Sequence, residues 1–112
     1  MFVSNVTMIK ETEFSLEGAR RVKIQKLIDE TLAKNFMMRR FIIEKNGYTP
    51  LHKHNYEHEV FVLSGRGTVR SDVEEYQISK NSFVFLAPNE SHQFLNKGKE
   101  SLILLCMIPK IN

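Results

Sequence analysis

The sequence predicts an all-β fold, a small antiparallel barrel or sandwich formed by one domain. From residue 36 onward, short segments rich in large apolar and β-branched residues are separated by turn residues, at a spacing of roughly 8–12 residues and with no helical pattern between them. A chain of 112 residues suits a single hydrophobic core. All four histidines lie within this β-rich region, which is therefore also where we expect the functional site.

The β-type segments follow one another from residue 36 to residue 108, and turn chemistry separates them. Lys45-Asn46-Gly47 is expected to end the first strand, and Gly65 and Gly67 lie in the turn after the second. Residues 68–70 and 76–78 are expected to form a hairpin. The expected strands are 36–44, 58–63, 68–70, 76–78, 83–86, 93–95 and 101–108.

The first 35 residues carry a weaker pattern. Residues 19–34 could form an amphipathic helix, with Val22, Ile28 and Leu32 loosely on one side. They could equally form a strand, because Val22 and Ile24 alternate with charged and polar residues, and periodicity alone leaves both open. Residues 2–9 are expected to form an extra strand that pairs with a second subunit, so we expect a homodimer.

Composition and charge exclude several classes of protein. The net charge of +3 favours acidic partners, but in the densest basic stretch, residues 20–26, charges alternate with apolar residues, and no recognition helix or stacking motif accompanies it. We therefore expect no nucleic-acid binding. No apolar run approaches the roughly 20 residues that span a bilayer, so we expect no membrane segment. Residues 1–5 lack signal-peptide features and Cys106 is the only cysteine, which predicts a cytoplasmic protein.

The histidines have the spacing of a metal site. His52 and His54 share one face of an extended strand, because side chains alternate with a period of two. A straight strand from His54 to His58 would cover about 13 Å, so the intervening residues must bend if His58 is to join the pair. His92 arrives from a distant segment and would close the site. Imidazole ligands predict a first-row transition metal, and they suit Zn, Cu, Fe and Ni.

Two longer motifs surround these histidines, and together they resemble the two signatures of the cupin superfamily. The first is residues 47–54 followed by Glu59 and Gly65, and the second is residues 81–87 followed by Asn89, His92 and Asn96. Asn81, Ala87 and Asn89 stand where the family has glycine, proline and glycine, and asparagine tolerates left-handed backbone well. The resemblance implies a single cupin domain over residues 1–112, with N-terminal strands in 1–35 and a jelly-roll barrel (double-stranded β-helix) over 36–108.

The sequence is most similar to small single-domain bacterial cupins that bind manganese through four histidines. The resemblance implies manganese, with iron, nickel, zinc and copper as alternatives, and a site of His52, His54, His58 and His92. Most cupins use a glutamate as the third ligand, and this chain offers His58 and Glu59 there. Adjacent strand residues point to opposite faces, so only one can face the metal, and the histidine-rich pattern favours His58.

Several further residues are expected to line a pocket around the metal. Arg39 shares a strand face with Phe41, and it could act as a clamp for an anion or carboxylate, or form an ion pair at a strand edge or interface. Phe94 lies two residues after His92 and should face the same cavity. Cys106 is expected to be a core residue and not a nucleophile. It shares a strand face with two further candidates, Leu104 and Ile108.

Such a site points to a metalloenzyme. Four neutral imidazoles leave the full charge on a divalent ion, which makes the ion a strong Lewis acid for anionic oxygen ligands. The leading hypothesis is a metal-dependent oxidoreductase, similar to a dioxygenase, that acts on a small organic molecule. The second is a metal-containing barrel that binds or senses a small ligand without turnover, and the third is a metal-free barrel similar to isomerases or lectins. No general base stands out.

Overall fold

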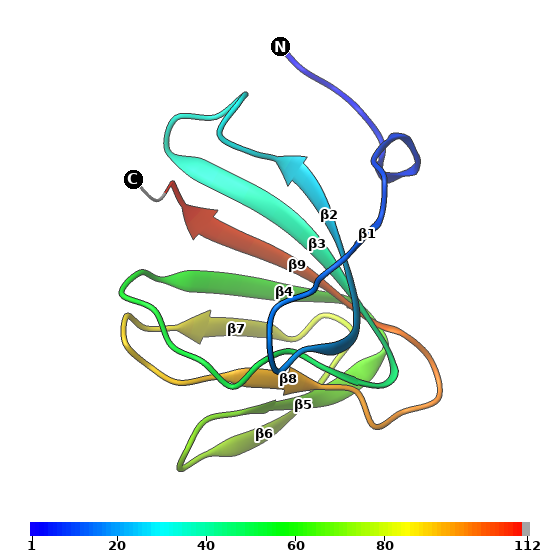
Figure 1. The fold of residues 1–112 in the computed structure, drawn as a ribbon, viewed down its shortest axis with the longest axis vertical. Helices are drawn as coiled ribbons and strands as arrows, with labels where there is room; N and C mark the ends of the chain where they lie inside the picture. Colours follow the sequence, from blue (N-terminus) through cyan, green and yellow to red (C-terminus); the bar gives the residue numbers. More distant parts are fainter. Residues whose placement is uncertain (111–112) are drawn as a thin grey trace.

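The computed structural model describes residues 1–110, which form nine strands and one short 3-10 helix. The strands belong to one antiparallel sheet that curls into a barrel, in the order β6-β5-β8-β3-β9-β4-β7, with β2 paired to the free side of β3 (Figure 1). The predicted all-β class is confirmed. The strands are β1 (Thr12–Glu13), β2 (Arg20–Ile28), β3 (Phe36–Tyr48), β4 (His58–Ser64), β5 (Arg66–Arg70), β6 (Glu75–Ser79), β7 (Phe83–Leu86), β8 (Gln93–Leu95) and β9 (Leu102–Pro109).

The alternation of side chains decides which face of each strand is buried. On β9, Leu102, Leu104, Cys106 and Ile108 are buried, and the residues between them are half-buried. β4 behaves in the same way, with His58, Val60 and Val62 buried. Because apolar residues recur at every second position on neighbouring strands, their side chains meet inside the curl and form one core.

The turn expected at residues 45–47 is wrong, because β3 continues through it to Tyr48. Asn46 has a left-handed backbone with φ of 64°, and a Cβ on Gly47 would lie 2.8 Å from the carbonyl oxygens of Arg20 and Glu44. These two residues bend the strand without ending it. β3 therefore pairs with β9 at Ile43 and with β8 at Tyr48, which carries it from one side of the barrel to the other.

In the N-terminal third, packing decides between the helix and the strand that the sequence left open. Residues 20–28 are the strand β2, and Val22 and Ile24 are buried against β3. The strand expected over residues 2–9 is wrong, since this segment holds a 3-10 helix at Val6–Met8. The amide of Gln25 donates to the carbonyls of Val6 and Ile9, and these bonds replace strand pairing. The expected homodimer stays a prediction.

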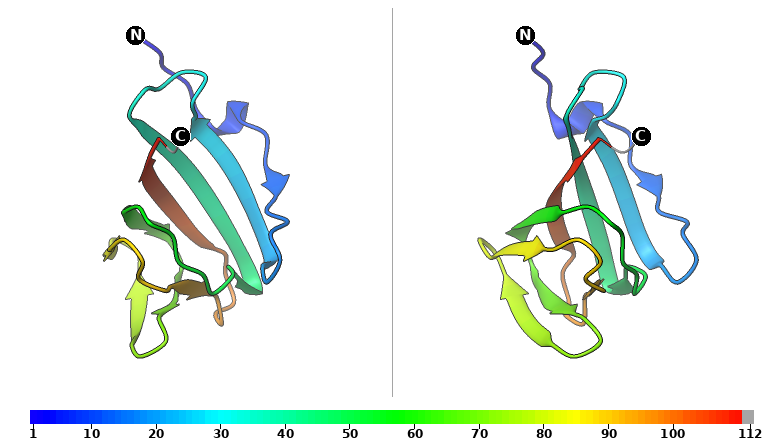
Figure 2. Two further views of the ribbon diagram at one scale, coloured as in Figure 1. Left: turned by 60° about the vertical axis from the view of Figure 1, so that its left-hand side comes forward. Right: turned by 90° about the vertical axis from the view of Figure 1, so that its left-hand side faces the viewer.

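Two views from the side show the N-terminal segment lying outside β2, while β5 and β6 form a hairpin at the opposite end of the barrel (Figure 2). That hairpin was expected from the sequence. Asn81 and Asn89 adopt φ of 77° and 65°, so both asparagines do take the left-handed backbone expected where the cupin pattern has glycine. Among residues 1–110 there is no helix of the length and apolarity needed to cross a bilayer.

Gly65 joins β4 to β5 and should tolerate no side chain. Its φ is 86°, and a Cβ would collide with the carbonyl oxygen of Ser101. Gly18 has a similar φ of 89°, but a Cβ there would only touch Pro50 at 3.4 Å. We predict that Gly65→Ala lowers the free energy of unfolding by about 3 kcal/mol or more, and that Gly18→Ala costs about 1 kcal/mol from backbone strain alone. Urea denaturation of both variants measures this, and equal losses would contradict it.

Candidate metal centre

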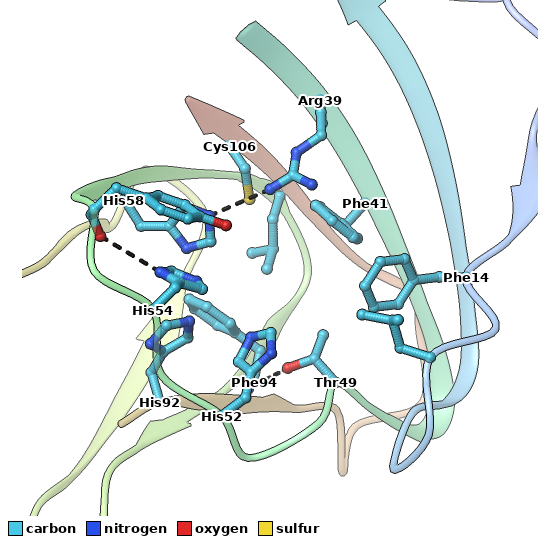
Figure 3. Close-up of a pocket in the computed structure, with 13 residues that line it drawn as sticks. Phe14, Arg39, Phe41, Thr49, His52, His54, His58, His92, Phe94 and Cys106 are labelled. Atoms are coloured by element: carbon cyan, nitrogen blue, oxygen red, sulfur yellow. Dashed lines mark hydrogen bonds between the residues drawn. The ribbon is translucent and has the colours of Figure 1, made fainter. Parts of the chain in front are cut away.

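Three short pieces of chain bring the four histidines together. His52 and His92 form an isolated antiparallel bridge, with N–O distances of 3.2 and 2.9 Å between their backbones. His54 follows on the same loop, and His58 opens β4. The chain bends between the last two, so that their ring centroids lie 4.5 Å apart. All four imidazoles therefore gather at one end of the barrel cavity (Figure 3).

Three of these rings form a ligand set. Single ring nitrogens of His52, His54 and His92 lie within 4.8 Å of one another. The Nδ1 atoms of His54 and His92 lie 3.4 and 3.0 Å from the carbonyl oxygens of Tyr56 and Glu90. A carbonyl only accepts, so both Nδ1 atoms carry the proton and both Nε2 lone pairs stay free.

The free lone pairs are what a metal requires. In the part of the chain that the structure describes, the Nε2 atoms of His54 and His92 are buried and meet no hydrogen-bond partner. Buried polar atoms are almost always paired, and these two are aimed with a third imidazole at a common point. Carbonyls that fix the tautomer of metal-binding histidines are a usual feature of such sites. The residues present therefore fit a transition-metal ion.

His58 lies beside this set but makes a different contact. Its ring is buried while Glu59 is exposed, as expected for adjacent residues of β4. The Nε2 atom of His58 lies 3.2 Å from Nη2 of Arg39. A guanidinium only donates, so this Nε2 is the acceptor, and Nδ1 carries a proton that finds no acceptor within residues 1–110. In this tautomer the one lone pair that the His58 ring could offer to a metal is therefore engaged by Arg39.

The histidines open into a cavity of about 120 Å³. Of the residues expected around it, Ile108 needs correction, because it lines a different depression near the end of β9. Ile108 pairs with Met37 at the start of β3. It therefore lies one inward-facing position further along β9 than Cys106, which pairs with Arg39. The other expected residues do line the cavity: Arg39, Phe41, Phe94, Leu104 and Cys106.

Four lining residues were not expected from the sequence: Phe14, Leu16, Thr49 and Tyr56. Tyr56 stacks on His54, with ring centroids 4.1 Å apart and an interplanar angle of 3°. The position of Tyr56 between His54 and His58 could have indicated that it lines the cavity. The position of Thr49 within the first motif could have indicated the same. Phe14 meets the ring of Phe41 edge-on at 5.1 Å, and nothing local in the sequence brings it there.

Burial keeps the cavity groups neutral. Burial, with a contribution from His92 and His54, lowers the pKa of His52 to about 4, and burial next to His54 and Arg39 lowers the pKa of His58 to about 3. Burial also lowers the pKa of His54 and His92. The pKa of the Cys106 thiol rises to about 12, so it is no thiolate. None of the lining residues is Asp or Glu, and Arg39 carries the one formal charge among them.

These pKa values predict acid sensitivity of the metal-free protein. An unfolded histidine has a pKa of 6.5, so the unfolded chain binds more protons than the folded one from about pH 6.5 down to about pH 3. The free energy of unfolding should therefore fall as the pH drops through that window. We expect urea denaturation of EDTA-treated protein to show a smaller fall between pH 7 and pH 5 for the variant with His52→Gln and His58→Gln. Parallel pH profiles of variant and parent would contradict this.

Comparison with known proteins agrees with the fold. The family model described as the cupin domain matches residues 39–108. The polyketide cyclase RemF of Streptomyces resistomycificus is 27% identical, with a TM-score of 0.92 over 97% of this chain and 79% of that one. A predicted oxalate decarboxylase of Thermotoga maritima is 22% identical, with a TM-score of 0.88 over 98% of this chain and 100% of that one, and shows the same fold.

A curated relative matches part of the chain. The protein MJ1618 of Methanocaldococcus jannaschii, described as uncharacterised, is 32% identical over 66 residues, which is 58% of this chain and 53% of that protein. The matched segment is thus about half the length of this relative. The family model covers most of the barrel and both histidine motifs. The chain therefore belongs to the cupin domain family.

Proposed function

We propose that this protein is a metal-dependent enzyme of the oxidoreductase type, similar to a dioxygenase, that acts on a small organic anion. The observation that carries the proposal is the convergence of imidazole nitrogens within 4.8 Å of one another, with the lone pairs of His54 and His92 held inward by backbone carbonyls. Such an arrangement has no evident structural use, because it leaves buried nitrogens without partners.

In this proposal His52, His54 and His92 hold a divalent transition metal, and His58 is the fourth ligand. Manganese comes from the resemblance to four-histidine cupins, and iron, nickel, zinc and copper suit imidazole ligands as well. When bound, the ion would supply Lewis acidity and, if redox-active, a path for electrons between substrate and dioxygen.

The remaining residues favour a substrate that arrives already ionised. The lining contains no carboxylate, the histidines serve as ligands, and Cys106 stays protonated, so no side chain is placed as a general base. A carboxylate or an acidic enol needs none, because it loses its proton in water. Phe41, Phe94 and Leu104 form an apolar wall that excludes water from the reacting groups.

A second candidate function follows from the similarity to RemF. That protein is described as a polyketide cyclase and aligns with 97% of this chain. The same site could therefore activate a carbonyl for ring closure without any redox step. The cavity of about 120 Å³ is far below the roughly 300–1,000 Å³ of sites for larger ligands, which favours a small substrate over a polyketide.

The two candidates differ in their need for dioxygen. Protein loaded with Mn or Fe is incubated with small enols, diols and 2-oxo acids in an oxygen electrode, and again under argon. Oxygen uptake that matches substrate loss supports the oxidoreductase, and equal substrate loss under argon supports ring closure or another non-redox reaction. Saturable binding of a ligand with no chemical change in either condition would refute both and indicate a binding barrel.

The ligand role of His58 gives a separate prediction. We expect His58→Ala to weaken metal binding by about 100-fold, because it removes a ligand. Glu59→Ala is the matched control, since it changes the next residue of β4 on the exposed face, and it should leave binding unchanged. Metal content after gel filtration, measured by elemental analysis, ranks the two. A larger loss in Glu59→Ala would show that the glutamate is the ligand, and equal content in both would reduce the site to three histidines.

A further inference from the structure

Arg39 is the one cationic side chain in the cavity, and its contacts are unusual. It lies on β3 opposite Cys106 of β9, so its side chain enters the barrel. Nη2 reaches His58, and Cζ lies 5.2 Å from the centroid of the Phe41 ring (Figure 3). Nε is buried and has no hydrogen-bond partner among residues 1–110. A guanidinium with five donors is thus left with an imidazole and an aromatic face.

Among residues 1–110, the contacts of the Arg39 guanidinium include no carboxylate. Asp29 and Glu30 line a neighbouring depression that Arg39 also borders. The guanidinium contacts His58 and Phe41 instead. A partly buried cation is costly unless an anion or a metal-site ligand compensates it, and arginine keeps its charge at any physiological pH. An anionic ligand is therefore a suitable counter-ion for Arg39.

We propose that Arg39 and the metal compete for His58, and that Arg39, once displaced, binds the anionic group of the substrate. This inference rests on the proposed metal site. The Nε2 atom of His58 has one lone pair, which either accepts from Arg39 or binds the ion. Metal binding at His58 breaks the arginine contact and turns the guanidinium toward a new acceptor. A carboxylate or enolate is the acceptor that matches its planar donors.

The competition makes metal and anion binding cooperative. The Arg39 guanidinium repels a divalent ion and also occupies the lone pair of the His58 nitrogen. Both effects lower the affinity of the site for the metal. An anion that binds Arg39 neutralises it and removes both effects. By linkage, the anion raises the metal affinity by the same factor by which the metal raises the anion affinity. Arg39 is thus a specificity-determining residue that selects anionic ligands and ties their binding to the loaded site.

The size of the cavity bounds the anion. A cavity of about 120 Å³ is a little smaller than the engineered cavity of about 150 Å³ that holds benzene, so it has room for a small organic anion. The expected class is a small monocarboxylate or enolate with a second oxygen for the metal, for which pyruvate is a suitable probe.

Calorimetric titration tests the coupling without any turnover. Zn²⁺ is titrated into metal-free parent protein, with and without pyruvate, and pyruvate into protein with and without Zn²⁺. We expect each ligand to tighten the other about tenfold or more in the parent protein. Arg39→Met should bind Zn²⁺ about tenfold more tightly without pyruvate. Its coupling should be weaker than in the parent, because only the direct contact between pyruvate and the metal is left. Arg39→Lys keeps the charge and should keep more of the coupling.

Two controls separate this role from a merely structural one. Arg40→Met removes the same charge from the next position of β3, which points to the other face and bonds Gln25, and it should bind Zn²⁺ like the parent. In a His58→Ala background, Arg39→Met should no longer tighten Zn²⁺ binding, because the contested atom is gone.

The outcomes are distinct from those of the proposed function. If Arg39→Met and Arg39→Lys leave Zn²⁺ affinity and the pyruvate coupling unchanged, the inference is wrong even where the enzyme turns over. If the coupling is present but no substrate is converted, the inference stands and the enzymatic proposal fails. A parent protein that binds no Zn²⁺, Mn²⁺ or Fe²⁺ overturns both.

Discussion

The register of β3, β9 and β4 is the constraint on which the whole site depends. It sets Arg39, Cys106 and Val60 side by side on the inner face of the barrel, with His58 two residues before Val60. Because side chains alternate, a slip of β3 and β4 by one residue would exchange Arg39 for Arg40 and His58 for Glu59. The buried imidazole of His58 would then be replaced by a carboxylate in the cavity. The irregular pairing between Val62 and Ser64, followed by the left-handed Gly65, fixes where β4 ends.

Much of this arrangement could be predicted from local patterns. Alternation on β4 allows only one of His58 and Glu59 to face inward, and the histidine-rich pattern favours His58, which is indeed the buried one. The asparagines at 81 and 89 do adopt the left-handed backbone that was expected for them. Other features depend on contacts between distant segments. Gly47 looks like a turn residue in sequence, but two neighbouring strands continue the pairing and make it a bend. Phe14 follows β1, and the pairing of β1 with β2 places it against Phe41 in the cavity. No local periodicity of the sequence predicts this pairing.

The electrostatic character of the cavity follows from what lines it. Burial lowers the pKa of every histidine there and raises that of the thiol, so the lining stays uncharged apart from Arg39. Cupins with a glutamate ligand would place a negative charge beside the ion. If a divalent metal bound in the pocket of this chain, no lining carboxylate would offset its charge, and the excess positive charge would favour anionic oxygen ligands.

The bridge between His52 and His92 also bears on how a metal ion would be taken up. The backbones of these two residues are hydrogen-bonded to each other, and the ring of His92 is held by a carbonyl, so the ligand frame is built by the fold itself. In zinc fingers, by contrast, the ion supplies the folding energy and its removal unfolds the chain. An ion in this barrel could therefore be exchanged while the protein stays folded. Its identity would then follow from the metals that the cell makes available during synthesis and repair, and a damaged or mismatched centre could be reloaded without refolding the protein.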